Sequence, residues 1–237
     1  MKRFLRFCAC CVLILSVVYV SLLFSPWKAA LPGYHTVCYP ASKYPAACLE
    51  FRKALDSCSM KGDEKRAATL MRKGVQENLF NYWEGTRWNF NGTTQTPGKG
   101  SIACGYFVTT MLRDMGVPVQ RVNYAKMASE KMIKKLVAEK NISRFSNIPL
   151  ADFVKAIEKK GDQVYVLGLD NHVGFLVCEN KQVYFIHSSG RWPWAVVKEN
   201  ARKSIVLSKS KYRVAGCLTA DDQFMQRWLY ASSSVSR

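Results

Sequence analysis

One stretch of the sequence decides the expected fold: residues 172–187 read HVGFLVCENKQVYFIH. Two runs rich in Val, Ile, Tyr and Phe, 172–178 and 182–187, flank the polar residues 179–181. Such runs on either side of a short polar turn are typical of a β-hairpin. The stretch therefore predicts two antiparallel strands with a histidine at the outer end of each.

The register of this hairpin decides how the two histidines meet. A two-residue turn at Asn180–Lys181 pairs His172 with Ser189, whereas a turn centred one residue earlier pairs His172 with His187. In either register the two imidazoles share a face and lie within about two residues of each other. This arrangement suits a histidine base whose ring is oriented by a second polar residue.

Outward from the hairpin, the pattern predicts the rest of the domain. Further strand-like runs occur at 163–169, 204–207 and 212–218. Helices are expected before these strands, at 46–57, 63–82, 104–115, 124–140 and 150–160. Helices followed by consecutive short strands indicate an α+β domain, with N-terminal helices packed on a C-terminal antiparallel β-sheet.

Cys104 is the candidate nucleophile. It opens the expected helix 104–115, directly after a segment, 85–103, that is rich in Gly, Thr, Asn and Pro. Free backbone N–H groups and the positive end of the helix dipole favour the thiolate there and can hold an oxyanion. The alternative is a buried structural cysteine, because free cysteines are often buried.

Together with Cys104, the histidines favour catalysis by a thiol. His172 is the expected base and His187 the residue that orients it. A zinc site needs three or four protein ligands, and the chain has only three histidines, so no metal ligand and no cofactor are assigned. Gly105 would let chain or substrate approach the thiol closely, and Trp88 would wall a groove, although such aromatics are more often core residues.

Three segments resemble the NlpC-type cell-wall cysteine peptidases, a branch of the papain-like fold. They are GTRWNFNG at 85–92, IACGYFV at 102–108, and HVGFLV at 172–177 followed by FIHSS at 185–189. The resemblance spans about residues 79–218. It implies that Cys104 is the nucleophile, His172 the base and His187 the third polar residue, with Trp88 beside the oxyanion site. It also implies cleavage of amide bonds in peptidoglycan stem peptides.

The charge of the chain points to an anionic partner. The 237 residues carry a formal net charge of +18, and such a surface attracts polyanions. Nucleic acid, anionic lipid and anionic cell-wall polymers all qualify. Because no zinc-finger, recognition-helix or RNA-binding signature occurs, no specific nucleic-acid partner is expected. Peptidoglycan or another anionic cell-wall polymer is the expected partner.

The first residues carry an export pattern. Lys2, Arg3 and Arg6 precede an uncharged apolar run, residues 7–24, whose 18 residues just suffice to span a bilayer. We expect an uncleaved membrane anchor, with a cleaved signal peptide as the alternative. Since a positive flank stays in the cytoplasm, the remainder is expected in the periplasm or outside the cell.

The expected organisation has three parts. Residues 1–30 form a signal anchor or signal peptide, residues 31–62 a linker with a short helix, and residues 63–237 a papain-like cysteine hydrolase domain. The domain is expected to hold a helical insert at about 120–161. An exported chain can form disulfides, and Cys38, Cys48 and Cys58 lie ten residues apart, but their spacing does not determine a pairing.

Two other functions remain open at this level. An exported acyltransferase or protein deamidase would use the same three residues, and the long segment 120–161 is compatible with another acceptor. A non-catalytic cell-wall-binding module would bind through the basic surface. In that module the thiol of Cys104 would be incidental, and could be paired with Cys178 or Cys217.

Overall fold

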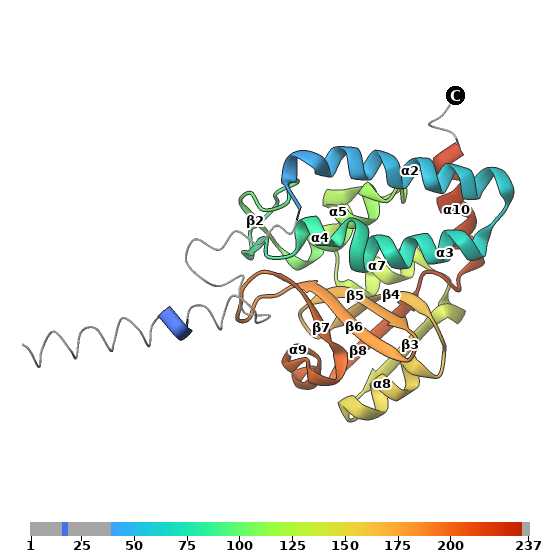
Figure 1. Cartoon of the computed structure of the whole chain (residues 1–237). Helices are drawn as coiled ribbons and strands as arrows, with labels where there is room; N and C mark the ends of the chain where they lie inside the picture. The colour runs from blue at the N-terminus through green and yellow to red at the C-terminus, as the bar shows by residue number, and fades with distance from the viewer. Residues whose placement is uncertain (1–15, 19–38, 234–237) are drawn as a thin grey trace, which may run out of the picture.

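A six-stranded antiparallel sheet forms the centre of the molecule. The computed structural model describes residues 16–18 and 39–233 (Figure 1). The strand order is β3-β8-β4-β5-β6-β7. The strands are β3 (Ile142–Ser146), β4 (Gln163–Leu169), β5 (Val173–Glu179), β6 (Gln182–Ser188), β7 (Val196–Asn200) and β8 (Tyr212–Cys217). Two further strands, β1 (Arg87–Trp88) and β2 (Ser101–Ile102), form a small parallel pair.

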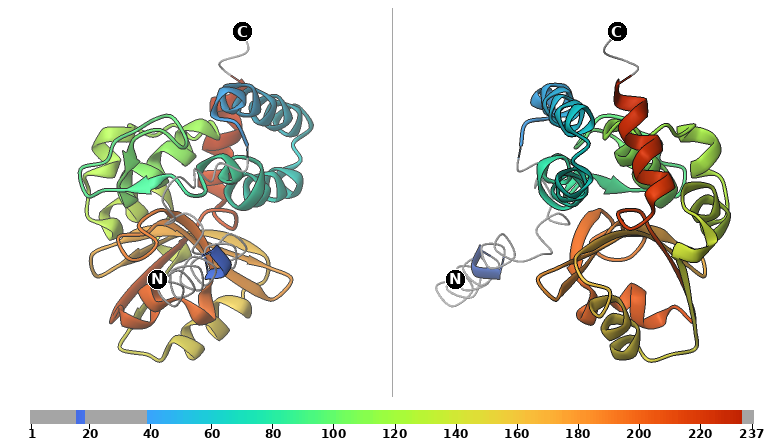
Figure 2. Two further views of the ribbon diagram at one scale, coloured as in Figure 1. Left: turned by 60° about the vertical axis from the view of Figure 1, so that its left-hand side comes forward. Right: turned by 90° about the vertical axis from the view of Figure 1, so that its right-hand side faces the viewer.

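Helices cover both faces of this sheet (Figures 1 and 2). One face carries α3 (Glu64–Lys73), α4 (Phe80–Trp83), α5 (Cys104–Asp114) and α7 (Ser129–Leu136). Over these lie α2 (Tyr44–Lys61) and α10 (Asp222–Ser233), which contact each other. The opposite face carries α8 (Leu150–Glu158) and α9 (Ile205–Lys209). The expected α+β class with an antiparallel sheet is confirmed, and a buried apolar cluster lies on each face.

The hairpin adopts the first of the two expected registers. Phe175 pairs with Ile186, and the turn residues Asn180 and Lys181 have φ of 50° and 60°. Two successive residues of positive φ suit the right-handed twist of the flanking strands. The strands expected at 163–169, 172–178, 182–187 and 212–218 all form, within a residue at each end.

The run 204–207 is helical, not a strand. The hydroxyl of Ser204 accepts a hydrogen bond from the Leu207 N–H at 3.2 Å and so caps α9. The buried guanidinium of Arg213 donates to the Leu207 carbonyl at 2.8 Å and holds the end of this turn. The edge strand is instead β7, which the sequence analysis missed. Its first residue, Val196, exchanges backbone hydrogen bonds with Gly85 and Thr86.

The segment 120–161 is not purely helical, which corrects the expected helical insert. It contains α6 (Arg121–Ala125), α7, a short 3-10 turn (Glu139–Asn141), the edge strand β3 and α8. The helix expected over 124–140 breaks because Ala128 has extended backbone, with φ −55° and ψ 139°. Met132 and Ile133 of α7 are fully buried on the sheet, so this segment supplies part of the core.

Residues 39–62 belong to the domain and are not a linker. Helix α2 runs through 18 residues, longer than the expected short helix, and begins after a 3-10 turn (Ala41–Lys43). Its residues Phe51 and Leu55 are buried in the core, and the Tyr44 hydroxyl donates to Asp114 at 2.8 Å. Four side chains of α2 are buried and pack on the core, those of Tyr44, Phe51, Leu55 and Cys58.

The cysteines and the N-terminal segment complete the comparison with expectation. Cys48, Cys58, Cys104, Cys178 and Cys217 are all free thiols. No bond therefore joins Cys48 to Cys58, while Cys38 lies outside the described residues. The expected anchor or signal, residues 1–30, also lies outside them except for 16–18. Among the helices of the described ranges, none is both long enough and apolar enough to cross a bilayer.

Candidate functional site

Two histidines meet at the end of the sheet where β5 begins and β6 ends. The Nε2 atom of His172 lies 2.8 Å from the Nδ1 atom of His187. His187 is fully buried, and its ring stacks on that of Phe185 with centroids 4.1 Å apart. Burial lowers the pKa of His172 well below its ordinary value, and the charge of His187 lowers it further. His172 is therefore a neutral imidazole at neutral pH.

Cys104 is placed by helix α5, which contacts β5 and β6. The preceding residue, Ala103, has extended backbone and no side chain that could cap the helix. The N–H groups of the first turn are thus left for the thiol or for a substrate oxygen. The backbone N–H groups of Val173, Gly105 and Cys104 face the sulfur. The thiol therefore lies against Val173, the first residue of β5, which directly follows His172 in the chain.

Burial outweighs these N–H groups in setting the pKa of the thiol. Burial raises the pKa of Cys104 above its ordinary value, and the three N–H groups lower it by less. The N–H groups at the helix end favour the thiolate, as expected, but their effect on the pKa is smaller than that of burial. The helix end does contribute, but the apolar surroundings of α5 and the sheet dominate.

The Cys104 thiol and the His172 ring are both in their neutral forms at neutral pH. No hydrogen bond between the Cys104 thiol and the His172 ring is formed within residues 39–233. His172 Nε2 already contacts His187, which leaves Nδ1 as the ring nitrogen for the thiol. Catalytic hydrogen bonds are often long in a free enzyme and tighten with substrate. The arrangement can thus support a proton transfer that accompanies attack of the sulfur.

A buried hydrogen bond ties the nucleophile segment to the histidine strand. The Ser188 hydroxyl donates to the carbonyl of Ile102 at 2.7 Å. Ser188 directly follows His187, and Ile102 lies two residues before Cys104. This contact fixes the end of β6 against the start of α5.

Trp88 is the second residue of β1 and packs against the loop that follows β6. Its backbone N–H donates to the Trp194 carbonyl at 2.7 Å. Its indole covers Gly190, where an added Cβ would lie 2.9 Å from the ring atom Cζ2. The half-buried Trp88 is therefore held against Gly190, which lies three residues after His187 in the chain.

The packing of α5 on α6 requires a glycine at position 105, which the sequence pattern did not indicate. A Cβ at this position would lie 2.4 Å from the carbonyl oxygen of Ala125 in α6. The close approach is thus made by the chain itself, and it places α6 directly on the first turn of α5. The N–H of Gly105 still faces the sulfur, as an oxyanion donor must.

Glu199 extends the chain of contacts, and the sequence analysis missed it. Its Oε1 atom lies 3.1 Å from Nε2 of His187, so one line of contacts links β5, β6 and β7. Although burial raises the pKa of Glu199, the hydrogen bond and charge of His187 lower it more, so the carboxylate is ionised. The available signal was an acid two residues after the apolar run 195–197. It went unused because the strand was not predicted.

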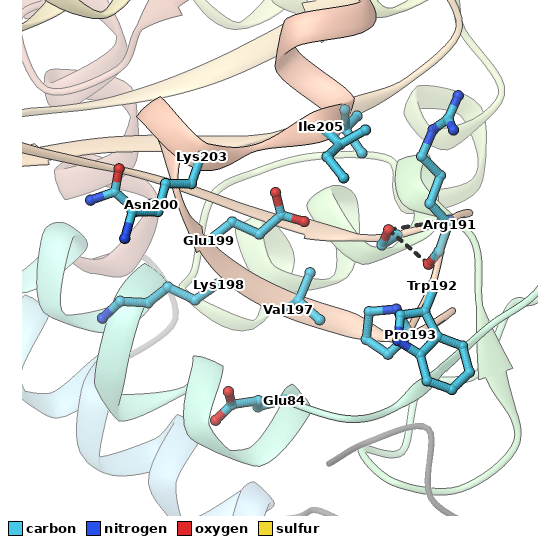
Figure 3. Close-up of a pocket in the computed structure, with 12 residues that line it drawn as sticks. Glu84, Arg191, Trp192, Pro193, Val197, Lys198, Glu199, Asn200, Lys203 and Ile205 are labelled. Atoms are coloured by element: carbon cyan, nitrogen blue, oxygen red, sulfur yellow. Dashed lines mark hydrogen bonds between the residues drawn. The ribbon is translucent and has the colours of Figure 1, made fainter. Parts of the chain in front are cut away.

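A cavity of about 670 Å³ lies on the outer side of Glu199. Figure 3 shows the carboxylate among the side chains that line it. The cavity is walled by Val197, Ile205, Trp192 and Pro193 and carries the charged residues Glu84, Arg191, Lys198 and Lys203. Cys104 does not line it, so this cavity lies at the far end of the contact chain from the thiol.

The residues of the site offer no metal centre. In the part of the chain that the structure describes, no cluster of three or more His, Cys, Asp or Glu side chains is placed to hold an ion. Comparison of the chain with models of protein families, with curated proteins and with solved structures finds no match. The interpretation of the site therefore depends on its geometry and chemistry.

Proposed function

We propose that this protein is a cysteine hydrolase of papain-like type that cleaves amide bonds in peptidoglycan stem peptides. Cys104 is the nucleophile, His172 the base and His187 the residue that orients the base. The observation that carries the proposal is the 2.8 Å contact between His172 and His187 beside the N-terminal end of the helix that begins with Cys104. The resemblance to NlpC-type peptidases in the same three segments supports the substrate class.

The chemistry follows from the protonation states. Nδ1 of His172 takes the proton of Cys104 as the sulfur attacks the amide carbon. The N–H groups of Cys104 and Gly105 hold the oxyanion. The carbon–nitrogen bond then breaks, His172 returns the proton to the leaving amine, and a thioester remains. Water activated by His172 hydrolyses the thioester, which restores the thiol and releases the acid.

The surface around the site is suited to an anionic, extended substrate. Arg87 and Arg191 are exposed, and each adjoins one of the two residues, Trp88 and Gly190, that pack together beside the site. Trp192 is 44% exposed and contacts Trp194 edge to face. Exposed cations and aromatic rings suit the carboxylates and the sugar faces of a cell-wall polymer. Export through residues 1–30 would bring the enzyme to that polymer.

Purified muropeptides test this proposal. We expect the wild-type protein to release stem-peptide fragments, and Cys104→Ala to release none, as measured by mass spectrometry. Cys48→Ala is the matched control, because Cys48 is also a half-buried free thiol but lies on α2. Equal activity of wild-type protein and Cys104→Ala would remove the thiol from the mechanism.

The same measurement separates the other candidate functions. Transfer of the acyl group to an added amine, or loss of an amide nitrogen from a protein substrate, would identify an acyltransferase or a deamidase. Binding of wall polymer without any product would identify a non-catalytic wall-binding module. The two enzymatic outcomes have distinct product masses, and co-sedimentation of the protein with wall polymer without any product would show the binding module.

A further inference from the structure

We infer that Glu199 is a positioning residue that sets the tautomers of both histidines, so that His172 presents an unprotonated Nδ1 to the thiol. The inference rests on the proposed function for its catalytic consequence. The arrangement of protons itself follows from the contacts between Glu199, His187 and His172.

The first step concerns the carboxylate. An ionised carboxylate only accepts hydrogen bonds, so the 3.1 Å contact between Glu199 Oε1 and His187 Nε2 requires a proton on that nitrogen. The hydroxyl of Ser204 also hydrogen-bonds to Glu199 and favours its charged form. Glu199 therefore acts as an acceptor at the outer end of the contact chain.

The second step concerns His187. With its proton on Nε2, His187 can keep a lone pair on Nδ1, and we infer that this lone pair accepts from Nε2 of His172. The ring of His187 cannot turn to make other bonds, because it is fully buried and stacked on Phe185 with an interplanar angle of 19°. Gly174 on β5 also lies close, so that an added Cβ would be 2.8 Å from the His187 Cβ.

The third step concerns His172. A proton on Nε2 of a neutral imidazole leaves Nδ1 unprotonated, which is the state that a base for Cys104 needs. In the opposite set of tautomers, Nδ1 of His172 carries the proton and cannot accept another. When His172 becomes an imidazolium during the reaction, the carboxylate of Glu199 also stabilises its positive charge across His187.

The pairing of β7 with β6 fixes the position of Glu199. Strand β7 pairs with β6 so that Glu199 lies opposite Phe185, diagonal to His187. The carboxylate borders the cavity that also carries Glu84, Arg191, Lys198 and Lys203. These four charged residues line the cavity together with Glu199, and the variants proposed below leave all four unchanged.

Substitutions at Glu199 test the inference. Glu199→Met removes the acceptor at similar volume, and Glu199→Gln keeps an amide oxygen that can accept. We expect Glu199→Met to lower kcat on muropeptides by about 10²-fold or more with little change in KM, and Glu199→Gln to recover part of the loss. Glu158→Met is the control, because the Glu158 side chain has similar exposure and forms an ion pair with Arg202, away from the histidines.

Nitrogen-15 NMR of the imidazoles gives a readout that needs no substrate. The chain contains only three histidines, His35, His172 and His187, so single substitutions assign the spectrum. We expect protons on Nε2 of both His172 and His187 in the wild-type protein, and a shift of both toward Nδ1 in Glu199→Met. Glu199→Gln keeps an acceptor, so its nitrogen-15 spectrum should resemble that of the wild type. That result would show that a change seen in Glu199→Met reflects the tautomers and not a change in folding.

The outcomes separate this inference from the proposed function. Wild-type tautomers in a folded Glu199→Met protein, or unchanged kcat in that variant of an active enzyme, would overturn the role of Glu199. The expected tautomers in a protein that cleaves no muropeptide would leave the proton arrangement standing and refute the proposed substrate.

Discussion

The imidazole rings of His172 and His187 meet edge to face, with centroids 4.9 Å apart and planes at 86°. This orientation directs the ring nitrogen Nε2 of His172 at Nδ1 of His187. One histidine ends the turn before β5 and the other lies near the end of β6, so the backbone of the hairpin holds both. Their relative position therefore depends on the sheet and not on a flexible loop.

Replacing His187 tests its role as the acceptor for His172. His187→Leu leaves the Nε2 proton of His172 without a partner, and the base loses its orientation. We expect kcat/KM on muropeptides to fall by about 10²- to 10⁴-fold. His187→Gln, whose amide oxygen can accept, should retain more activity than His187→Leu. Equal rates for wild-type protein and His187→Leu would exclude an orienting role.

The pH dependence of activity reports the base. The pKa of His172 lies well below its ordinary value of 6.5, mainly because of burial. The active neutral imidazole is thus kept as the pH falls through 6.5, and kcat/KM should decline only at more acidic pH. An acid limb centred at or above 6.5 would contradict the lowered pKa.

The same shift affects stability. Because the unfolded chain binds the His172 proton more readily than the folded one, this group favours the folded state fully above pH 6.5. Its contribution is lost as the pH falls from 6.5 through the lowered native value. The urea midpoint of the wild-type protein should therefore fall relative to that of His172→Gln as the pH drops below 6.5, whereas a constant difference across this range would refute the linkage.

Alkylation reports the state of the thiol. Because burial raises the pKa of Cys104 above its ordinary value of 9.0, iodoacetamide should modify Cys104 more slowly at pH 7 than it modifies a free cysteine. The rate should continue to rise above pH 9. Cys104→Ala gives the background from the other thiols. Rapid modification at pH 7 that disappears in Cys104→Ala would indicate a resting thiolate instead.

Two leucines of α2 test whether residues 39–62 belong to the domain. Leu55 is fully buried and Leu49 is 56% exposed on the same helix. We expect Leu55→Ala to lower the free energy of unfolding by about 2–5 kcal/mol and Leu49→Ala to change it by less than about 0.5 kcal/mol. Chemical denaturation measures both. Similar small effects would indicate that α2 is not part of the cooperative unit.

Gly105→Ala tests the contact between α5 and α6. The added Cβ would meet the backbone carbonyl of Ala125, which cannot rotate away as a side chain can. We expect a loss of about 1–3 kcal/mol in the free energy of unfolding, measured by chemical denaturation. An unchanged midpoint would show that α6 moves freely from α5.

Local patterns in the sequence were sufficient for the hairpin and for the helix that begins at Cys104. Apolar strand-like runs and a short polar turn are local features of the sequence, so they were enough to predict His172 and His187 on one face of the hairpin. Apolar residues at helical spacing, followed by Gly116, likewise predicted α5, and Gly116 has a φ of +88° in the structure.

Tertiary packing decided what local pattern could not. Residues 204–207 have the composition of a strand, but the Ser204 cap and the Arg213 contact make them helical. Glu199 reaches His187 only because β7 pairs with β6, a contact between segments 12 residues apart. The pKa of Cys104 depends on the apolar groups that surround it, which come from distant parts of the chain. Burial and long-range pairing are properties of the assembled fold, so no single segment of sequence encodes them.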